Sequence, residues 1–281
     1  MTAKRGTTYK IVISIILLLV SVLSLAPFVY LCIASFVNDM SHVFENGINL
    51  HITLDMLGLG NYSMLFTEND GSYLSWYKNS VIITILFTAI SVFFCSLVGY
   101  GVAMYDFKGK KILIVIILST MMIPFEILML PLYKEMLFFK LINTYAGVVL
   151  PFAVSGFAIY FFMQYAQTIP HDFIDAARVD GCGELRIFFQ VMIPIMLPAF
   201  ATMGILQATT EWNDFLWPLI VMSTNKNFTL TVGLQTYLSP YGNDYNMLFA
   251  GAVLSVIPIM VAFLCNQKLF ISGLTLGGVK G

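Results

Sequence analysis

Six apolar stretches of 20 residues or more decide what this chain can fold into. A helix that crosses about 30 Å of hydrocarbon needs roughly 20 apolar residues, because every backbone N–H and C=O group there must be bonded within the helix. The sequence therefore predicts an all-α, polytopic membrane protein with one transmembrane domain over residues 1–281 and six transmembrane helices. The predicted spans are 11–33, 80–105, 112–133, 146–165, 195–222 and 247–266.

Composition supports a membrane protein and excludes several other classes. Only 10% of the 281 residues are charged and 59% are hydrophobic, whereas about 25% of the residues in a soluble domain are charged. The net charge of −1 gives no electrostatic basis for nucleic-acid binding. The four cysteines and three histidines show no metal-binding spacing. No metal site, cofactor or nucleic-acid partner is expected for this chain.

The distribution of Lys and Arg predicts that both termini are cytoplasmic, because positively charged loops stay in the cytoplasm. The long segment 34–77 is then extracellular, and it carries five acidic residues and no Lys or Arg. At about 44 residues it is too long for a bare connection, so some local structure is expected there. With this orientation, ten of the 14 basic residues are cytoplasmic: Lys4, Arg5, Lys10, Lys108, Lys110, Lys111, Arg178, Arg186, Lys268 and Lys280.

The predicted cytoplasmic segment 169–190 reads as a pair of short helices. Pro170 suits the first turn of a helix, Gly181 suits its end, and residues 184–191 are again helical in pattern. On this evidence alone, an amphipathic segment at the lipid headgroups is a reasonable interpretation. At 100° per residue, one arc of the first helix holds Phe173, Ile174, Ala176 and Ala177, and the other holds His171, Asp172, Asp175 and Arg178.

The spacing of residues from 175 to 194 is more specific. Asp175-Ala176-Ala177 is followed after three residues by Gly181, and after nine more by Val191-x-Ile193-Pro194. This pattern resembles the EAA motif of ABC importer permeases, with Asp for the usual Glu, Val for Ile and Ile for Leu. Other segments resemble the carbohydrate-type subunits similar to the maltose permease MalG: Trp212-Asn213-Asp214-Phe215, Ile123-Pro124, Leu130-Pro131-Leu132-Tyr133, and the tail from Gly273 to Gly281.

The resemblance implies a type I ABC importer permease of the MetI-like fold in a bacterial cell membrane. The chain itself has no GxxxxGK[ST] phosphate loop, so ATP and Mg would be held by two separate ABC ATPase subunits. The other implied partners are a second, MalF-like permease chain, an extracellular sugar-binding protein and membrane lipid. Import of sugars or oligosaccharides is expected from the resemblance alone, and this permease subunit would not be an enzyme.

The resemblance also implies that segment 169–190 forms coupling helices that dock on the ATPase. Within it, Asp175 and Arg178 would provide polar anchoring, and Ala176 and Ala177 would allow close packing. Gly181 would form the turn.

Glu126, Glu211 and Asp214 are the ionisable residues within the predicted spans. A central charge costs roughly 2.5–3.5 kcal/mol even on insertion scales, so such groups should face a cavity or a partner. A three-residue spacing puts Glu211 and Asp214 on one helix face. The favoured interpretation places residues 211–218 near the outer interface, where Trp is common.

Two other roles stay open for this region. Glu211, Asn213, Asp214 and Glu126 could line a gate or the translocation path, or the region could contact substrate, with Trp212 and Trp217 stacking on sugar rings. Glu126 is expected to form a hydrogen bond across a subunit interface. The alternative function is an ion- or proton-coupled carrier that uses the three acids as a relay, although such carriers usually have internal repeats and none is visible here.

Overall fold

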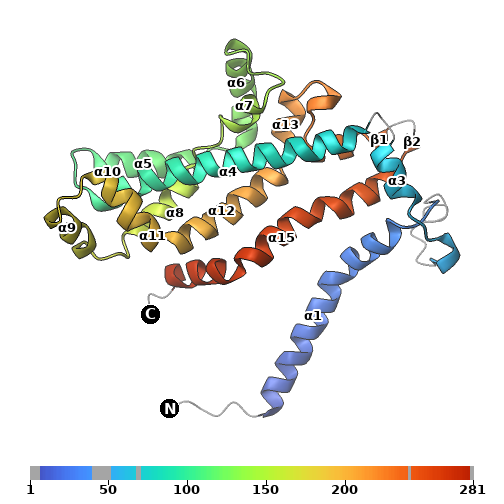
Figure 1. The fold of residues 1–281 in the computed structure, drawn as a ribbon, viewed down its shortest axis with the longest axis horizontal. Coiled ribbons are helices and arrows are strands. Elements are labelled where there is room, and N and C mark those ends of the chain that lie inside the picture. The colour runs from blue at the N-terminus through green and yellow to red at the C-terminus, as the bar shows by residue number, and fades with distance from the viewer. Residues whose placement is uncertain (1–6, 40–51, 68–70, 240–241, 279–281) are drawn as a thin grey trace. The chain divides into compact units, whose positions relative to one another are not determined.

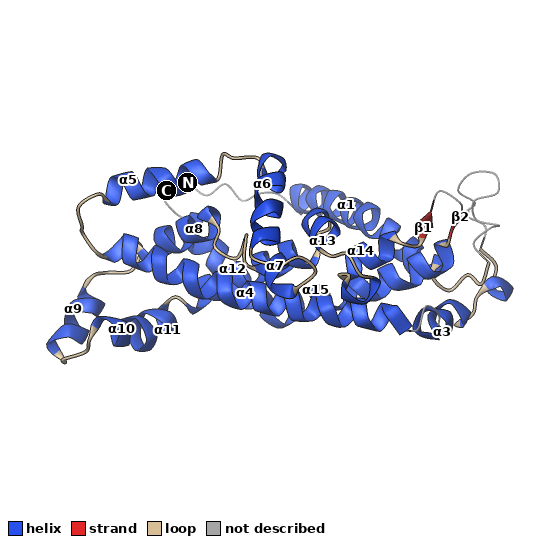
Figure 2. Ribbon diagram, turned by 90° about the horizontal axis from the view of Figure 1, so that it is seen from above, coloured by secondary structure: helices blue, strands red, loops and turns tan. Residues whose placement is uncertain are grey.

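The computed structural model describes residues 7–39, 52–67, 71–239 and 242–278, and most of them are helical (Figure 2). The expected all-α architecture is confirmed. Figure 1 shows the elements in order. They are α1 Thr7–Ala34, η1 Leu54–Met56, α3 Gly60–Thr67, α4 Ser72–Met104, α5 Lys110–Thr120, α6 Phe125–Phe138, α7 Tyr145–Val149, α8 Gly156–Ala166, α9 Asp172–Val179, α10 Glu184–Ile187, η3 Phe188–Met192, α11 Ile193–Ile195, α12 Leu197–Trp212, α13 Leu216–Val221, η4 Asn225–Asn227, α14 Leu230–Gln235, β1 Leu238–Ser239, β2 Gly242–Asn243 and α15 Tyr245–Gly278.

Three helices in the described part of the chain are long and apolar enough to cross a membrane: Tyr9–Ala34, Ser72–Met104 and Tyr245–Cys265. Two bent pairs pass the same test together, which gives up to five spans if each pair is one span. The pairs are Lys110–Thr120 with Phe125–Phe138, bent by 98°, and Glu184–Ile195 with Leu197–Trp212, bent by 80°. The six-span topology stays a prediction.

Prolines explain why two predicted spans are not continuous helices. The stretch 112–133 is divided between α5 and α6 at Pro124, which precedes α6. Proline has no N–H to donate to the carbonyl four residues earlier, and it also disfavours helical geometry in the residue before it. The stretch 146–165 is divided in the same way between α7 and α8, with Pro151 in the connection.

The predicted helix 195–222 also ends early, at Trp212, and the chain resumes helical geometry at Leu216. Pro218 cannot donate a hydrogen bond to the carbonyl of Asp214, and its ring would clash there in a continuous helix. The Thr231 hydroxyl donates to that carbonyl oxygen instead, at 2.6 Å. The single span expected over 195–222 is therefore divided into α12, a short turn and α13.

The chain forms two compact units, and the first comprises the described residues within 1–73 and 234–256. Its apolar cluster is built around Ala34 and Val37. The Asn61 side chain donates to the carbonyl oxygens of Ser35 and Val37, at 3.0 and 2.7 Å. The local structure expected within 34–77 is thus present at η1 and α3, while residues 40–51 and 68–70 of that segment lie outside the described residues.

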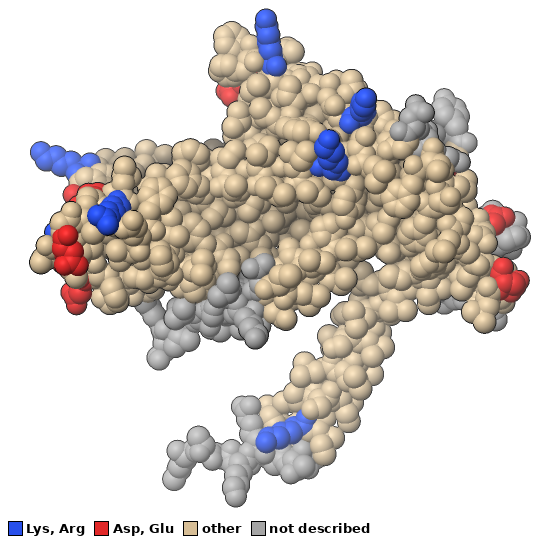
Figure 3. Space-filling model, in the orientation of Figure 1, with Lys and Arg blue, Asp and Glu red and all other residues tan. Residues whose placement is uncertain are grey.

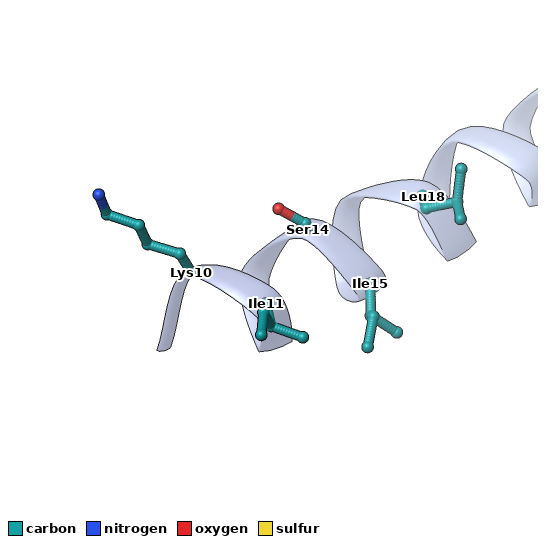
Figure 4. A pocket seen from close by; sticks show the side chains of 5 residues that line it. All are labelled: Lys10, Ile11, Ser14, Ile15 and Leu18. Carbon is teal, nitrogen blue, oxygen red and sulfur yellow. The ribbon is translucent and has the colours of Figure 1, made fainter. Parts of the chain in front are cut away.

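Helix α1 belongs to the first unit and carries exposed apolar side chains along its length. A shallow hollow near its start is lined by side chains of this one helix (Figure 4). Because no other described element lines it, the described residues enclose no volume there in which a ligand could be held. Its lining residues are Lys10, Ile11, Ser14, Ile15 and Leu18.

The second unit comprises residues 74–233 and 257–281, of which 279–281 lie outside the described residues. One apolar cluster joins α4, α5, α8, α9, η3 and α12, and another joins α4, α6, α7 and α13. Helices α5 and α8 lie side by side (Figure 1). A Cβ at Gly156 would lie 2.6 Å from the Thr120 hydroxyl oxygen and 2.8 Å from the Ile117 carbonyl oxygen. This glycine therefore permits the close contact.

Candidate functional site

Helices α9 and α10 lie next to each other in the second unit (Figure 1). Gly181 joins them with φ of +79°, a left-handed conformation that glycine adopts without strain. The Cys182 N–H donates to the Ala177 carbonyl at 3.0 Å, which satisfies a carbonyl at the helix end in the manner of a Schellman cap. The residues predicted to form a helix, a turn and a second helix do so in the structure.

The apolar arc predicted for α9 divides into a buried and an exposed part. Ile174 and Ala177 are 1% and 7% exposed and belong to the apolar core of the second unit. Phe173 and Val179 are 49% and 88% exposed, and Ala176 is also exposed. We call Phe173, Ala176 and Val179 the open face of α9. The two alanines, predicted to pack on a partner together, thus point to different surroundings.

Arg178 is held by a polar network that joins α9 to α10. Its Nε donates to the Glu184 Oε1 at 3.0 Å, and its Nη1 lies 3.5 Å from the Asp175 Oδ1. The hydrogen bond to Glu184 raises the pKa of Arg178 above its usual value. Ion pairs this exposed add little stability, so the network serves mainly to orient the two helices.

Two tyrosines extend this network to the end of α4. The Tyr105 hydroxyl donates to the Glu184 Oε2, and the Tyr100 and Tyr105 hydroxyl oxygens are 3.0 Å apart. The Arg178 guanidinium carbon lies 5.8 Å from the centre of the Tyr105 ring, within reach of a cation–π contact. Sequence reasoning missed Tyr105 and Glu184, because neither lies at a motif position. Figure 3 shows acidic and basic side chains gathered over α9 and α10.

A cavity of about 450 Å³ lies in the second unit. Its wall combines three phenylalanine rings with polar and acidic side chains, and it is formed by α4, α6, α12, the turn after α12 and the α7–α8 connection. The lining residues are Phe87, Phe125, Phe152, Ser155, Gln207, Thr210, Glu211, Asn213 and Asp214.

Three of the four residues predicted for a gate or translocation path line this cavity: Glu211, Asn213 and Asp214. They do not share one helix face, because α12 ends at Trp212 and Asp214 lies in the turn that follows. The Asp214 N–H donates to the Glu211 carbonyl at 3.1 Å, which keeps the two acids close along the backbone. The fourth residue, Glu126, is exposed and is not part of the cavity wall.

The side chains of Glu211 and Asp214 differ in their hydrogen-bond partners. The Asp214 carboxylate interacts with the backbone N–H groups of Trp217, Phe215 and Leu216 at the start of α13. The Glu211 side chain is 9% exposed, and its Oε1 has no hydrogen-bond partner among the described residues. Buried polar atoms without a partner are uncommon in native proteins and call for an explanation.

The cavity is not lined by Trp212 or Trp217, the two rings that the sequence analysis considered for stacking on sugars. Trp217 is 1% exposed, and its Nε1 donates to the Gly147 carbonyl at 3.0 Å. The Trp212 ring packs edge-on against Tyr77, with ring centres 5.7 Å apart. Instead, Phe152 and Phe125 line the cavity, and their ring centres lie 5.5 and 6.4 Å from that of Trp217.

The comparisons with known proteins agree with these features. Residues 95–275 match the family described as binding-protein-dependent transport system inner membrane component. The chain belongs to this family. The matched range includes α9, α10, α12 and every residue of the cavity wall except Phe87. The chain is therefore a membrane-embedded permease component of a transport system.

Two relatives match this permease over nearly its whole length. The arabinooligosaccharides transport system permease protein AraQ of Bacillus subtilis is 46% identical over 276 residues, covering 98% of this chain and 97% of the relative. The lactose transport system permease protein LacG of Rhizobium radiobacter is 33% identical over 280 residues, covering 100% of both chains.

A solved structure shows the fold of the permease. A chain of a bacterial ABC transporter involved in the import of the acidic polysaccharide alginate superposes with a TM-score of 0.82. The identity is 22%, and the match covers 96% of this chain and 99% of the other. The ABC importer permease fold expected from the sequence is confirmed.

Proposed function

We propose that this permease is the transmembrane subunit of an ATP-driven ABC importer for sugars, with neutral arabino-oligosaccharides as the first substrate class to test. The observation that carries this proposal is the 46% identity to AraQ over 98% of the chain. A second AraQ protein, from Halalkalibacterium halodurans, is 47% identical over 93% of the chain. The relatives support an importer and give no support to the coupled-carrier alternative.

The open face of α9 is the proposed docking site for an ATPase subunit. Phe173, Ala176 and Val179 offer an apolar surface, and the Arg178–Glu184 network holds that surface in a fixed orientation. Gly181 forms the turn, and Asp175 lies beside the network. Ala177 does not lie on this open face. It supports docking indirectly, because its small side chain lets α9 pack closely on the apolar core of the second unit.

Movement of α9 would reach the cavity through the helices that follow it in the chain. Residues 184–195 lead into α12 with an 80° bend, and α12 carries Gln207, Thr210 and Glu211 into the cavity wall. Closure of the ATPases on ATP would move α9 as a rigid body, and the bend would pass that movement to the cavity. Rigid-body shifts of packed helices are a common form of such coupling.

The remaining partners follow from this role. Two ATPase subunits would hold ATP and Mg, a second and different MalF-like permease would complete the membrane domain, and lipid would surround it. Both termini and α9 would lie in the cytoplasm. Segment 34–77 would face an extracellular sugar-binding protein, and this permease would itself catalyse no covalent change.

The test is transport by the complete importer in proteoliposomes, with labelled arabinotriose supplied on its binding protein. We expect uptake that requires ATP hydrolysis and the loaded binding protein, and none with a non-hydrolysable ATP analogue. Uptake that needs only an ion or proton gradient would overturn the proposal. It would favour the alternative of a coupled carrier that uses acidic residues as a relay.

A further inference from the structure

The α9–α10 pair is connected to the rest of the second unit in two ways. The first connection is covalent, because α10 is followed along the chain by η3, α11 and α12. The second is a set of side-chain contacts with the end of α4, which lies far from the pair in sequence. These contacts centre on Tyr105, the residue that follows α4.

Tyr105 is held as an extension of α4. Its N–H donates to the Gly101 carbonyl at 3.2 Å, and its own carbonyl accepts a bond from the Lys110 Nζ at 3.1 Å. Its ring packs edge-on against Tyr100, with ring centres 5.7 Å apart. Tyr100 is 3% exposed, and its ring centre lies 5.2 Å from that of the buried Phe188. A displacement of the Tyr105 side chain would therefore displace α4 with it.

Three side chains form a closed triangle between α9, α10 and the end of α4. The Tyr105 hydroxyl donates to the Glu184 Oε2, and the Glu184 Oε1 accepts from the Arg178 Nε at 3.0 Å. The Arg178 guanidinium carbon lies 5.8 Å from the centre of the Tyr105 ring. One carboxylate of α10 therefore bridges α9 and the end of α4.

This triangle differs in kind from the apolar contacts of the same helices. Ile174, Ala177 and Ile187 are buried in the core of the second unit, and their burial resists separation of the pair from that core. Because the hydrophobic effect is non-directional, it resists sliding and rotation less. A hydrogen bond to a carboxylate is strong and depends on both distance and angle. The bond from Tyr105 to Glu184 therefore resists the movements that the apolar contacts permit.

The bond from Tyr105 is not needed to form the helix pair itself. The turn between the helices is made by Gly181, and the ion pair between Arg178 and Glu184 joins residues only six positions apart. Tyr105 and Glu184 are 79 positions apart. Their bond therefore adds a connection between distant elements and contributes little to the shape of either one.

We infer that Tyr105 and Glu184 are positioning residues that make the α9–α10 pair and α4 move as one body. The inference rests on the proposed function, since it assumes that an ATPase moves α9. Movement of α9 then reaches α4 directly, as well as reaching α12 along the chain. Phe87 of α4 and Glu211 of α12 both line the cavity, so both helices of its wall would respond to the ATPase together.

The test measures arabinotriose uptake per ATP hydrolysed by the complete importer in proteoliposomes with its loaded binding protein. Tyr105→Phe retains the ring contacts with Tyr100 and Arg178 and removes only the bond to Glu184. We expect uptake per ATP to fall about fivefold, the effect of losing one hydrogen bond, because the ATPases still close but α4 no longer follows. The amount of complex and its rate of ATP hydrolysis should stay near wild type.

Two further variants bracket this result. Glu184→Leu removes both bonds of the carboxylate and should lower uptake per ATP at least as far as Tyr105→Phe. Tyr160→Phe removes the hydroxyl of a partly buried tyrosine of α8 that has no part in the triangle. This control should leave uptake per ATP unchanged.

A covalent replacement of the bond separates a mechanical connection from a local structural role. Tyr105→Cys and Glu184→Cys are combined in a chain whose four native cysteines are replaced by serine, and a short bis-maleimide reagent joins the two new thiols. We expect low uptake per ATP before crosslinking and recovery afterwards toward the value of the cysteine-free chain that retains Tyr105 and Glu184. Treatment with N-ethylmaleimide, which cannot join the thiols, should give no recovery.

Three results would overturn the inference: wild-type uptake per ATP in Tyr105→Phe, no recovery on crosslinking, or a loss of complex that accounts for the whole loss of uptake. The unsubstituted importer distinguishes this failure from that of the proposed function. If it shows no ATP-dependent uptake, the proposed function fails and the inference fails with it. If it takes up sugar and Tyr105→Phe is equally coupled, the importer stands and only the connection through Tyr105 fails.

Discussion

Uptake is expected to fall below detection in the Phe173→Asp and Val179→Asp permeases, although both chains reach the membrane in normal amounts. The two side chains are 49% and 88% exposed, so neither substitution disturbs the core. Each places an unpaired carboxylate in the centre of the proposed ATPase contact. Loss of an apolar anchor at an interface typically costs about 2 kcal/mol or more, or about 30-fold in affinity, and a buried charge adds to that cost.

Three measurements check this expectation: substrate uptake, the amount of chain in the membrane, and the ATPase that co-purifies with it. Leu54→Asp is the matched control, because Leu54 is also 88% exposed but lies on η1 in segment 34–77; it should retain the ATPase. Unlike these three variants, Ala177→Asp should lower the amount of chain in the membrane, because Ala177 is 7% exposed and lies in the apolar core of the second unit. Normal ATPase recovery with Phe173→Asp and Val179→Asp would rule out docking through the open face of α9.

Replacing Gly99 by Leu is expected to remove most of the permease from the membrane. A Cβ at this position of α4 would lie 2.7 Å from the Phe162 Cβ and 2.8 Å from the Ile159 carbonyl oxygen and the Met163 nitrogen. Two of these atoms belong to the backbone of α8 and cannot move without shifting that helix. Overpacking of a well-filled core costs about 1–3 kcal/mol and more when the backbone must move, which is a large part of the stability of a domain.

Gly101→Leu is the control for this substitution, because Gly101 lies two residues further along the same helix. Among the described residues, a Cβ there would have no atom of another helix within 4 Å. The amount of chain and its thermal unfolding in detergent should therefore change for Gly99→Leu and stay near wild type for Gly101→Leu. If the two variants lose the same amount of chain and stability, Gly99 is not needed for the close contact between α4 and α8.

Much of the fold follows from patterns that act locally. Long apolar stretches predict membrane helices because the bilayer leaves the backbone no other partner, and Gly181 predicts the end of α9 because few other residues adopt its positive φ. The pattern did not show which prolines end a helix. Pro258 lies inside α15, whereas Pro218 is accompanied by a break after α12. That difference depends on partners such as Thr231, which lies far along the chain.

Some residues of the candidate sites can likewise be identified from the sequence, and others cannot. Acidic residues in an apolar span stand out, so Glu211 and Asp214 could be identified from the sequence. The phenylalanines that complete the cavity could not, because Phe125 and Phe152 resemble the other rings of an apolar span until the tertiary structure brings them together. Ala176 and Ala177 likewise look equivalent in a helical projection, and only the packing of α9 on its core separates them.

We propose that this chain works as one subunit of an ATP-driven sugar importer. The most direct test of this proposal is purification of the tagged chain from its native membrane in mild detergent, with every co-purifying protein identified by mass spectrometry. We expect an ABC ATPase and a second, different permease, with a sugar-binding protein recovered when sugar is present. A stable, monodisperse preparation of this chain alone, with no ATPase, would contradict it.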